Sequence, residues 1–132
     1  MKHFLLIDID PEHIPLIADR IEHFCQRAGM NLEDSFKVKI CATEAINNAV
    51  EHAYHFSRGN IDIDLCIEGN EIVVKISNDV PVAADSFSTV AEPDPGNERG
   101  RGWQIIEAWS DRSCVCRSEA RTTVRLYKRI CN

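Results

Sequence analysis

The sequence contains no continuous apolar run of the roughly 18 residues that a membrane-spanning helix requires. Its first residues, Met1-Lys2-His3, lead into a short strand-like run instead of a signal peptide. These two absences predict a cytoplasmic protein that has no membrane partner.

The chain also has no excess of positive charge. It contains 15 Lys and Arg residues against 21 Asp and Glu residues, which gives a formal net charge of -6. No dense block of Lys and Arg is present, so no basic field would attract a phosphate backbone. We therefore expect no nucleic-acid partner.

Cysteine is present, but its spacing does not indicate a metal site. Cys25, Cys41 and Cys66 occupy apolar-compatible positions in regular elements, where a reduced and buried thiol is the common outcome. Cys114 and Cys116 would face one side of a strand, yet no second Cys/His pair stands at zinc-like spacing. The sequence predicts free thiols.

The remaining pattern predicts one domain over residues 1–132, because 44% hydrophobic content at this length is enough for one core. Apolar periodicity predicts helices from about Ile14 to Gly29, from about Leu32 to His55, and after Gly100 with Ile105, Ile106 and Trp109 inward. Asn31, with Asp34 three residues on, resembles a capping box at the start of the second helix. Alternation predicts five strands, near 4–9, 61–67, 72–76, 113–117 and 122–130. The turn at Gly69-Asn70 makes the second and third a hairpin, in which Asp62 and Asp64 are interpreted as a solvated face. The order β-α-α-β-β-α-β-β indicates a two-layer α/β sandwich, with a mixed, mostly antiparallel sheet and helices on one face.

A polar stripe interrupts the second predicted helix. Glu44, Asn48 and His52 are spaced four residues apart and share one face, beside a thin stripe of alanines (Ala45, Ala49 and Ala53). Mg²⁺ prefers oxygen ligands and is often shared with substrate phosphates, so one amide oxygen can suffice to hold it. The alternative is a solvated helix face. His52 is assigned no role in the chemistry.

The segment after the predicted hairpin lacks periodicity. Residues 78–99 hold three prolines and scattered acids, and a loop of this length often serves as a lid over a site. Gly100 and Gly102 follow it at the start of a helix, where backbone N–H groups can approach a phosphate. The flanking Arg99 and Arg101 offer charge-assisted contacts. The same glycines could also merely turn a loop into a helix.

Three motifs together resemble the GHKL ATPase superfamily, and within it the small bacterial anti-sigma-factor serine/threonine kinases. They are Glu44-Ala-Ile-Asn-Asn-Ala-Val-Glu-His-Ala-Tyr54, Gly100-Arg-Gly-Trp-Gln-Ile-Ile106 and Thr122-Thr-Val-Arg-Leu126. They fall in the family's order and spacing, and the resemblance covers nearly the whole chain. It implies a GHKL (Bergerat-type) ATP-binding fold, ATP and Mg²⁺ as cofactors, and an ATP lid over residues 79–99.

The resemblance also implies roles for single residues. Glu44 matches the catalytic base, and Asn48 matches the Mg²⁺ ligand. Gly100 and Gly102 match the second glycine box around the phosphates, while Arg99 lies near a lid arginine of some relatives. Thr122 matches the threonine of the last motif near the nucleotide.

The chain departs from the family at two places. Asn78 stands where the family has an Asp that reads the adenine amino group, and the alternating glycines that should follow are replaced in Asp79-Val-Pro-Val82. An Asn side-chain oxygen can still accept a hydrogen bond from the adenine amine. Arg121 stands where a glycine normally precedes the threonine.

Three hypotheses follow. The first is an ATP-dependent serine/threonine protein kinase that phosphorylates a STAS-domain anti-anti-sigma factor and binds a sigma factor, as a homodimer. The second is a non-catalytic partner-binding module with a degenerate nucleotide site, which the altered segment at Asn78 motivates and an intact Glu44 and Asn48 oppose. The third is a histidine-kinase catalytic domain, disfavoured because no phosphoacceptor helix pair precedes the motifs.

Overall fold

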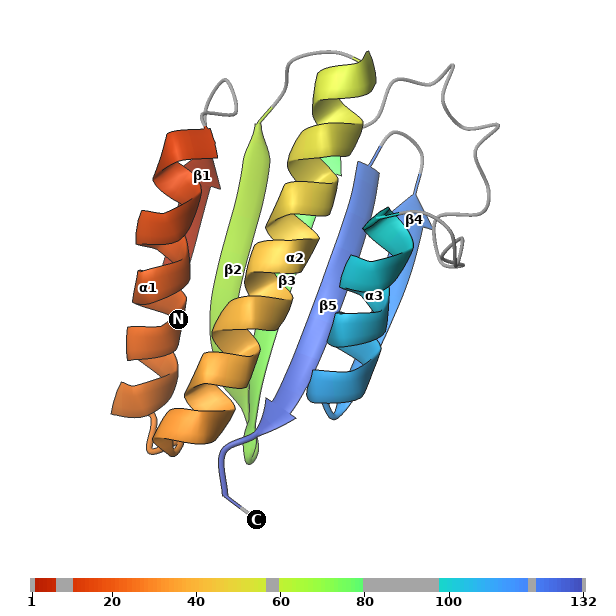
Figure 1. The fold of residues 1–132 in the computed structure, drawn as a ribbon. Helices are drawn as coiled ribbons and strands as arrows, with labels where there is room; N and C mark the ends of the chain where they lie inside the picture. Colours follow the sequence, from red (N-terminus) through yellow and green to blue (C-terminus); the bar gives the residue numbers. More distant parts are fainter. Residues whose placement is uncertain (1, 7–10, 57–59, 80–97, 119–120, 132) are drawn as a thin grey trace.

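A computed structural model describes residues 2–6, 11–56, 60–79, 98–118 and 121–131, with only the backbone described for 5–6, 11, 52–56 and 98–102. Along the chain the elements follow the order β1, η1, α1, α2, β2, β3, α3, β4 and β5. Figure 1 shows a layer of helices packed on one face of a sheet. The predicted two-layer α/β sandwich is confirmed.

The sheet has five strands in the order β1-β2-β3-β5-β4, and every described pairing is antiparallel. The strands are β1 (Lys2–Leu6), β2 (Ile61–Glu68), β3 (Glu71–Asp79), β4 (Arg112–Ser118) and β5 (Arg121–Arg129). The first strand was predicted over residues 4–9, but β1 begins at Lys2 and pairs through Leu6. Residues 7–10 lie outside the described part. The hairpin between β2 and β3 turns at Gly69, whose φ of 61° is a left-handed value that glycine adopts without strain.

Helix α1 (Ile14–Arg27) follows a short 3₁₀ turn, η1 (Pro11–His13). Pro15 lies in the first turn of α1, where its missing N–H leaves no hydrogen bond unmade. The helix ends before Gly29, which has a φ of 103°. A start near Ile14 and a stop at glycine are both as predicted.

Helix α2 (Leu32–Phe56) begins after an asparagine cap. The backbone N–H of Asp34 donates to Oδ1 of Asn31 over 2.7 Å, and the Asn31 amide donates to the Asp34 carboxylate over 3.3 Å. One of the free N–H groups of the first turn is thereby satisfied. The predicted cap is confirmed, with an Asp in the place of the usual Glu or Gln.

The core lies between the helices and the sheet. Its fully buried members come from every helix and from the central strands: Ile21 of α1, Ile46 of α2, Ile63 of β2, Ile76 of β3 and Ile106 of α3. Side chains alternate between the two faces along β2 and β3, which places Ile63 and Ile76 on the helix-facing side of the sheet. The hydrophobic effect therefore fixes which side of each strand faces the helices.

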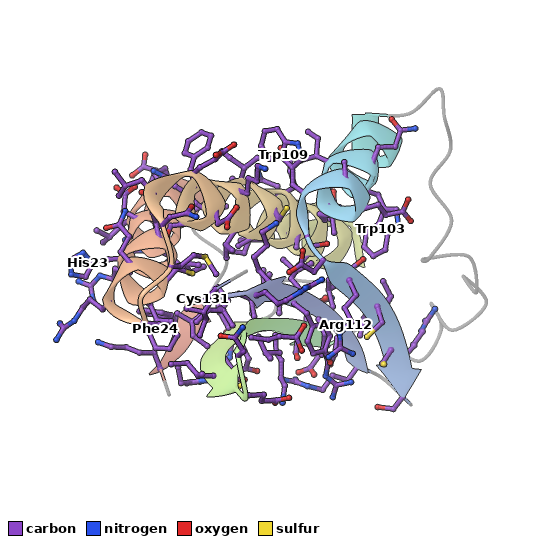
Figure 2. All side chains as sticks on the ribbon, turned by 90° about the horizontal axis from the view of Figure 1, so that it is seen from below. His23, Phe24, Trp103, Trp109, Arg112 and Cys131 are labelled. Carbon is purple, nitrogen blue, oxygen red and sulfur yellow. The ribbon has the colours of Figure 1, made fainter. Side chains whose placement is uncertain are left out.

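Helix α3 (Glu98–Trp109) packs beside α2. Ile106 is buried and Trp103 packs against the core, whereas Trp109 is 36% exposed. The prediction that Trp109 points inward is therefore wrong. Trp109 is the last residue of α3, where no further turn of helix is present to cover the indole. Both tryptophans are labelled in Figure 2.

No helix among the residues described here is long and apolar enough to cross a membrane.

Candidate functional site

Four of the predicted site segments meet at one end of the molecule. In Figure 1 the C-terminal half of α2, the end of β3, the start of β5 and the N-terminal end of α3 all lie at the same end of the sandwich. Glu44 and Asn48 are on α2, Asn78 is on β3, Thr122 is on β5, and both glycines are on α3. The fold thus gathers residues that are up to 78 positions apart in the chain (122 minus 44).

Glu44 and Asn48 lie one helical turn apart on α2 and are both partly exposed. Their neighbours Ala45 and Ala49 are buried against the core, so the small alanine side chains bring this stretch of α2 close to the sheet. Neither the Glu44 carboxylate nor the Asn48 amide has a hydrogen bond or ion pair among the described residues. Both groups are therefore available to a ligand.

Asn78 and Thr122 face each other across β3 and β5 on the helix-facing side of the sheet. They are 4% and 6% exposed, which makes them a buried polar pair at the end of an otherwise aliphatic surface. Asn78 donates one weak hydrogen bond, over 3.4 Å, to the carbonyl of Asp79. The Thr122 hydroxyl is buried and has no hydrogen-bond partner within the described ranges.

An unpartnered buried hydroxyl costs free energy, because the group gives up its bonds to water and gains nothing in return. A bound group with its own donors and acceptors would remove that cost. A polar ligand that carries a hard cation suits this set of groups, which consists of the Asn78 amide, the Thr122 hydroxyl, the Glu44 carboxylate and the Asn48 amide. The residues present therefore fit a magnesium-bound nucleotide.

Gly100 and Gly102 lie within the first turns of α3, which begins at Glu98. The helix therefore starts two residues earlier than the glycine motif predicts. The first four N–H groups of a helix have no partner within it, so the backbone around Gly100 still offers donors and a partial positive charge to an anion. The side chains of Arg99 and Arg101 are outside the description, and their contacts stay a prediction.

The segment predicted as a lid, residues 79–99, overlaps a strand at one end and a helix at the other. Asp79 is the last residue of β3, and Glu98 and Arg99 belong to α3. Residues 80–97 lie outside the described part of the chain, so the lid itself stays a prediction.

No cluster of three or more His, Cys, Asp or Glu residues that could hold a metal ion is present in the part of the chain that is described.

A groove of about 710 Å³ lies elsewhere, between α1 and the edge of the sheet at β1. It is lined by Lys2, Phe4, Arg20, Phe24, Arg27 and Ile67, among others. None of the predicted site residues lines it.

The cysteines are all free. Cys25 and Cys41 are buried, and desolvation raises the pKa of their thiols to about 12 and about 11. Burial also raises the pKa of Cys66. The prediction of free, buried thiols therefore holds for Cys25 and Cys41, which are kept in the protonated, unreactive form, and is wrong for Cys66, which is only partly buried.

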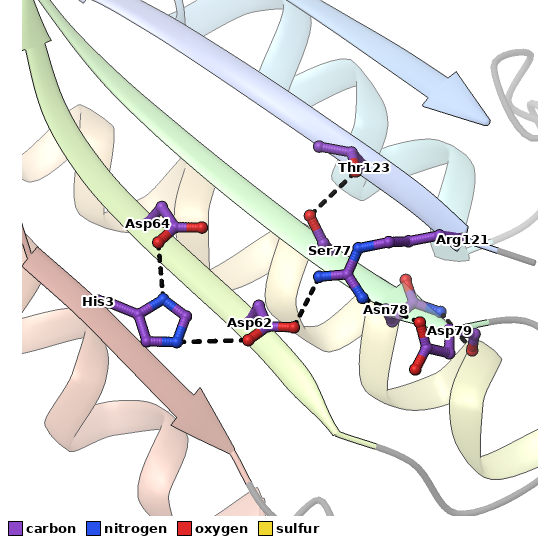
Figure 3. A network of polar contacts seen from close by, with 8 residues as sticks. All are labelled: His3, Asp62, Asp64, Ser77, Asn78, Asp79, Arg121 and Thr123. Atoms are coloured by element: carbon purple, nitrogen blue, oxygen red, sulfur yellow. Dashed lines mark hydrogen bonds and ion pairs between the residues drawn. The ribbon is translucent and has the colours of Figure 1, made fainter. Parts of the chain in front are cut away.

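The opposite face of the sheet carries a feature that the sequence interpretation missed. Asp62 and Asp64 were expected to form a solvated face, but both belong to a polar network on this outer face (Figure 3). Arg121 bonds to Asp62 and Asp79, and His3 bonds to Asp62 and Asp64. The only sequence signal for this network was Arg121 itself, at a position where the resembled family has glycine.

The sequence of residues 7–128 matches the family described as the histidine kinase-like ATPase domain. Among curated relatives, the serine-protein kinase RsbW of Staphylococcus epidermidis is 30% identical over 129 residues, covering 90% of this chain and 80% of the relative. The anti-sigma F factor of Clostridium kluyveri is 25% identical over 114 residues, covering 83% of this chain and 80% of the relative.

Solved structures share the fold at low identity. The RsbU and RsbW domains of a Mycobacterium tuberculosis protein match with a TM-score of 0.69 and 16% identity, over 98% of this chain and 33% of that chain. The SiaB–SiaC complex of Pseudomonas aeruginosa matches with a TM-score of 0.67 and 17% identity, over 96% and 88%. The catalytic domain of the histidine kinase ThkA matches with a TM-score of 0.56 and 15% identity, over 98% and 97%.

The resemblance that the three motifs indicate is therefore confirmed, since the family match spans nearly the whole chain and the relatives bear the names of a serine kinase and an anti-sigma factor. The chain belongs to the histidine kinase-like ATPase domain family.

Proposed function

We propose that the protein is an ATP-dependent serine/threonine protein kinase of the anti-sigma-factor type. The observation that carries the proposal is the pair Glu44 and Asn48, one turn apart on α2 and without partners in the described part of the chain, in a member of this ATPase family. A carboxylate and an amide held open beside the core have no structural use that the described contacts reveal.

In this proposal each residue has a distinct task. The Asn48 amide oxygen would hold Mg²⁺, which would neutralise phosphate charge when it is bound. Asn78 and Thr122 hold the base end of ATP through the buried amide and hydroxyl. The backbone at the start of α3, around Gly100, holds the phosphates, assisted by Arg99 and Arg101, whereas the N–H of Gly102 lies in the second turn and is paired within the helix.

Glu44 acts as the general base. It accepts the proton of the protein substrate's hydroxyl as the new oxygen–phosphorus bond forms, while the bond to the bridging oxygen breaks and ADP departs. Asn48 and the start of α3 position the reacting groups, which supplies most of what phosphoryl transfer needs from a protein.

The names of the relatives suggest the partners. One relative is named a serine-protein kinase and another an anti-sigma F factor, and a structural neighbour was solved as the SiaB–SiaC complex. We therefore propose a STAS-domain anti-anti-sigma factor as the phosphorylated partner, a sigma factor as the competing partner, and a homodimer as the active form.

The proposal is tested by incubating the protein with γ-labelled ATP, Mg²⁺ and a STAS-domain protein encoded near it. Label is expected on a serine or threonine, and both Glu44→Ala and Asn48→Ala should abolish it. Asn47→Ala is the matched control, because Asn47 is the same residue type at an exposed neighbouring position on α2. Label that survives both Glu44→Ala and Asn48→Ala would contradict the assigned roles.

A second function, a binding module without catalysis, is favoured by one observation. Asn78 stands where the resembled family has Asp, and the glycines expected after it are absent. This alternative predicts tight binding of a sigma factor with no nucleotide binding at millimolar ATP. The same protein preparation, tested for ATP binding and for sigma-factor binding, separates the two functions.

A further inference from the structure

Arg121 joins three strands from the outer face of the sheet. It is the first residue of β5, and its Nη2 lies 2.6 Å from Oδ2 of Asp62 on β2. Its Nη1 lies 2.9 Å from Oδ1 of Asp79 on β3. Because β3 lies between β2 and β5 in the sheet, one guanidinium links β5 to its neighbour β3 and to β2 beyond it.

The link extends to the edge strand. His3 on β1 lies with Nε2 3.3 Å from Oδ1 of Asp62 and with Nδ1 2.6 Å from Oδ1 of Asp64. Figure 3 shows the continuous run from His3 through Asp62 and Arg121 to Asp79. Four of the five strands are therefore tied together by side chains at this end of the outer face.

This network lies directly behind the buried polar pair of the candidate site. In the β3–β5 register Asp79 pairs with Arg121, and the next pair along is Asn78 with Thr122. Successive side chains on a strand point to opposite faces, so Asn78 and Thr122 face the helices while their neighbours face outward. A contact that fixes Asp79 against Arg121 therefore also fixes the spacing of the two site residues.

The two contacts of Arg121 differ in strength because the two carboxylates differ in exposure to solvent. The Asp62 side chain is 25% exposed and the Asp79 side chain 71%, so solvent screens the contact with Asp79 more strongly. The hydrogen bond to Asp62 is the main cause of the raised pKa of Arg121, and the bond to Asp79 adds to it. A guanidinium can make both contacts at once because its donors form a rigid fork, which a lysine ammonium lacks.

We infer that Arg121 is a positioning residue that holds Asn78 and Thr122 in the geometry that binds the nucleotide. The inference rests on the proposed nucleotide site. It also gives a physical role to an arginine at a position where the resembled family has glycine, since glycine could make neither contact. Arg121 touches no reacting group, so it should govern nucleotide affinity and leave the transfer step alone.

The test compares Arg121→Gln with Arg112→Gln in the full chain. Arg112 is a matched control, because it makes a similar ion pair with Glu71, over 2.8 Å, on the same face at the far end of β3. Arg121→Gln should weaken Mg²⁺-ADP binding about fivefold, while Arg112→Gln should change it less than twofold. Arg121→Lys should fall between them, and the transfer rate at saturating ATP should be unchanged in all three.

A second readout needs no nucleotide. In the free protein, hydrogen exchange of the backbone amides at residues 77–79 and 121–123 should be about fivefold faster in Arg121→Gln than in Arg112→Gln. If Arg121→Gln does not fold, Asp79→Asn removes one of the two contacts and should give a smaller increase at the same amides.

The outcomes separate the two proposals. Faster exchange in a protein whose wild type binds no Mg²⁺-ADP would overturn the nucleotide site and leave the strand-positioning role in place. Tight binding by the wild type with equal affinity in Arg121→Gln and Arg112→Gln would overturn the positioning role alone.

Discussion

The two ends of the β3–β5 pair have the same antiparallel register but bury different chemistry. At one end the helix-facing side chains are aliphatic, with Ile72, Val74 and Leu126 all buried in the core. At the other end Asn78 and Thr122 are buried, and the Thr122 hydroxyl lacks a partner in the described part of the chain. The aliphatic end stabilises the fold, whereas the polar end costs stability.

That difference teaches where function lies in this sheet. An apolar pair at the Asn78–Thr122 position would remove the cost of the buried hydroxyl, so polarity there is not explained by folding. The nucleotide that we propose to bind there would explain it. The same end of the molecule carries the open carboxylate and amide of α2 and the N-terminus of α3, whose first N–H groups have no partner within the helix. Four predictions sharpen the comparison, in order of decreasing effect.

The largest effect is expected from Glu44→Gln, which keeps the shape of the side chain and removes its basicity. Loss of a positioned general base typically lowers a rate by about 10² to 10⁴-fold. We expect a loss in this range in the rate of phosphoryl transfer, with Mg²⁺-ATP affinity little changed, measured in single-turnover assays. Glu33→Gln, at an exposed position on the same helix, serves as control. Wild-type rates in Glu44→Gln would show that another group takes the proton.

The next effect concerns the aliphatic end. Leu126→Ala removes a side chain that is 3% exposed, and truncations of this kind cost about 2 to 5 kcal/mol of unfolding free energy. Urea denaturation should show this loss, while the folded variant retains Mg²⁺-ATP binding. A variant that remains fully stable but loses nucleotide binding would contradict the assignment of stability to the aliphatic end and of nucleotide binding to the polar end.

The polar end should respond in the opposite way. Thr122→Val removes the unpartnered hydroxyl at nearly constant volume, so the unfolding free energy should stay constant or rise by up to about 1 kcal/mol. Nucleotide affinity should fall. Thr123→Val is the control on the outer face, where its hydroxyl lies 3.0 Å from Ser77 Oγ, and it should lose about 1 kcal/mol with affinity kept. Equal destabilisation by both variants would mean that Thr122 is satisfied within the free protein.

The most gradual effect is alkaline destabilisation from the buried thiols. In the folded chain the pKa of Cys25 is raised from 9.0 to about 12, so the unfolded state releases this proton first. The folded state therefore loses stability as the pH rises from 9 towards 12, by about 1.4 kcal/mol for each pH unit and thiol at most. Below pH 9 the contribution is fully present.

Urea denaturation at pH 8, 9 and 10 in the presence of a reductant measures this slope. Cys25→Ala should flatten it, and Cys116→Ser, at an exposed position, should leave it unchanged. An equal slope in Cys25→Ala would assign the alkaline loss to other groups.

Local patterns predicted most of the fold. Apolar spacing and glycine placed α1 between Ile14 and Gly29, and the Asn31 cap placed the start of α2, because the signals for these elements lie within a few residues of each other. The hairpin at Gly69 was predicted for the same reason. The start of β1 and the exposure of Trp109 were missed, since both depend on which parts of the chain end at the edge of the core.

The polar residues likewise divide into those that local spacing predicts and those that it does not. Glu44 and Asn48 are one turn apart on one helix, so their spacing alone places them on a common face. The network of His3, Asp62 and Arg121 joins strands that are distant in sequence, and strand alternation does not reveal which strands are neighbours or in what register they pair. Asp62 and Asp64 were therefore interpreted as a solvated face, because the sheet order β1-β2-β3-β5-β4 was not known from the sequence.

The most direct test of the central claim is calorimetric titration of the full chain with ATP in the presence and absence of Mg²⁺. If Asn48 holds Mg²⁺ beside a bound ATP, binding should be saturable and enhanced by magnesium in the wild type and in Asn47→Ala. The magnesium enhancement should be lost in Asn48→Ala. No binding at millimolar ATP with Mg²⁺, or an unchanged magnesium enhancement in Asn48→Ala, would contradict it.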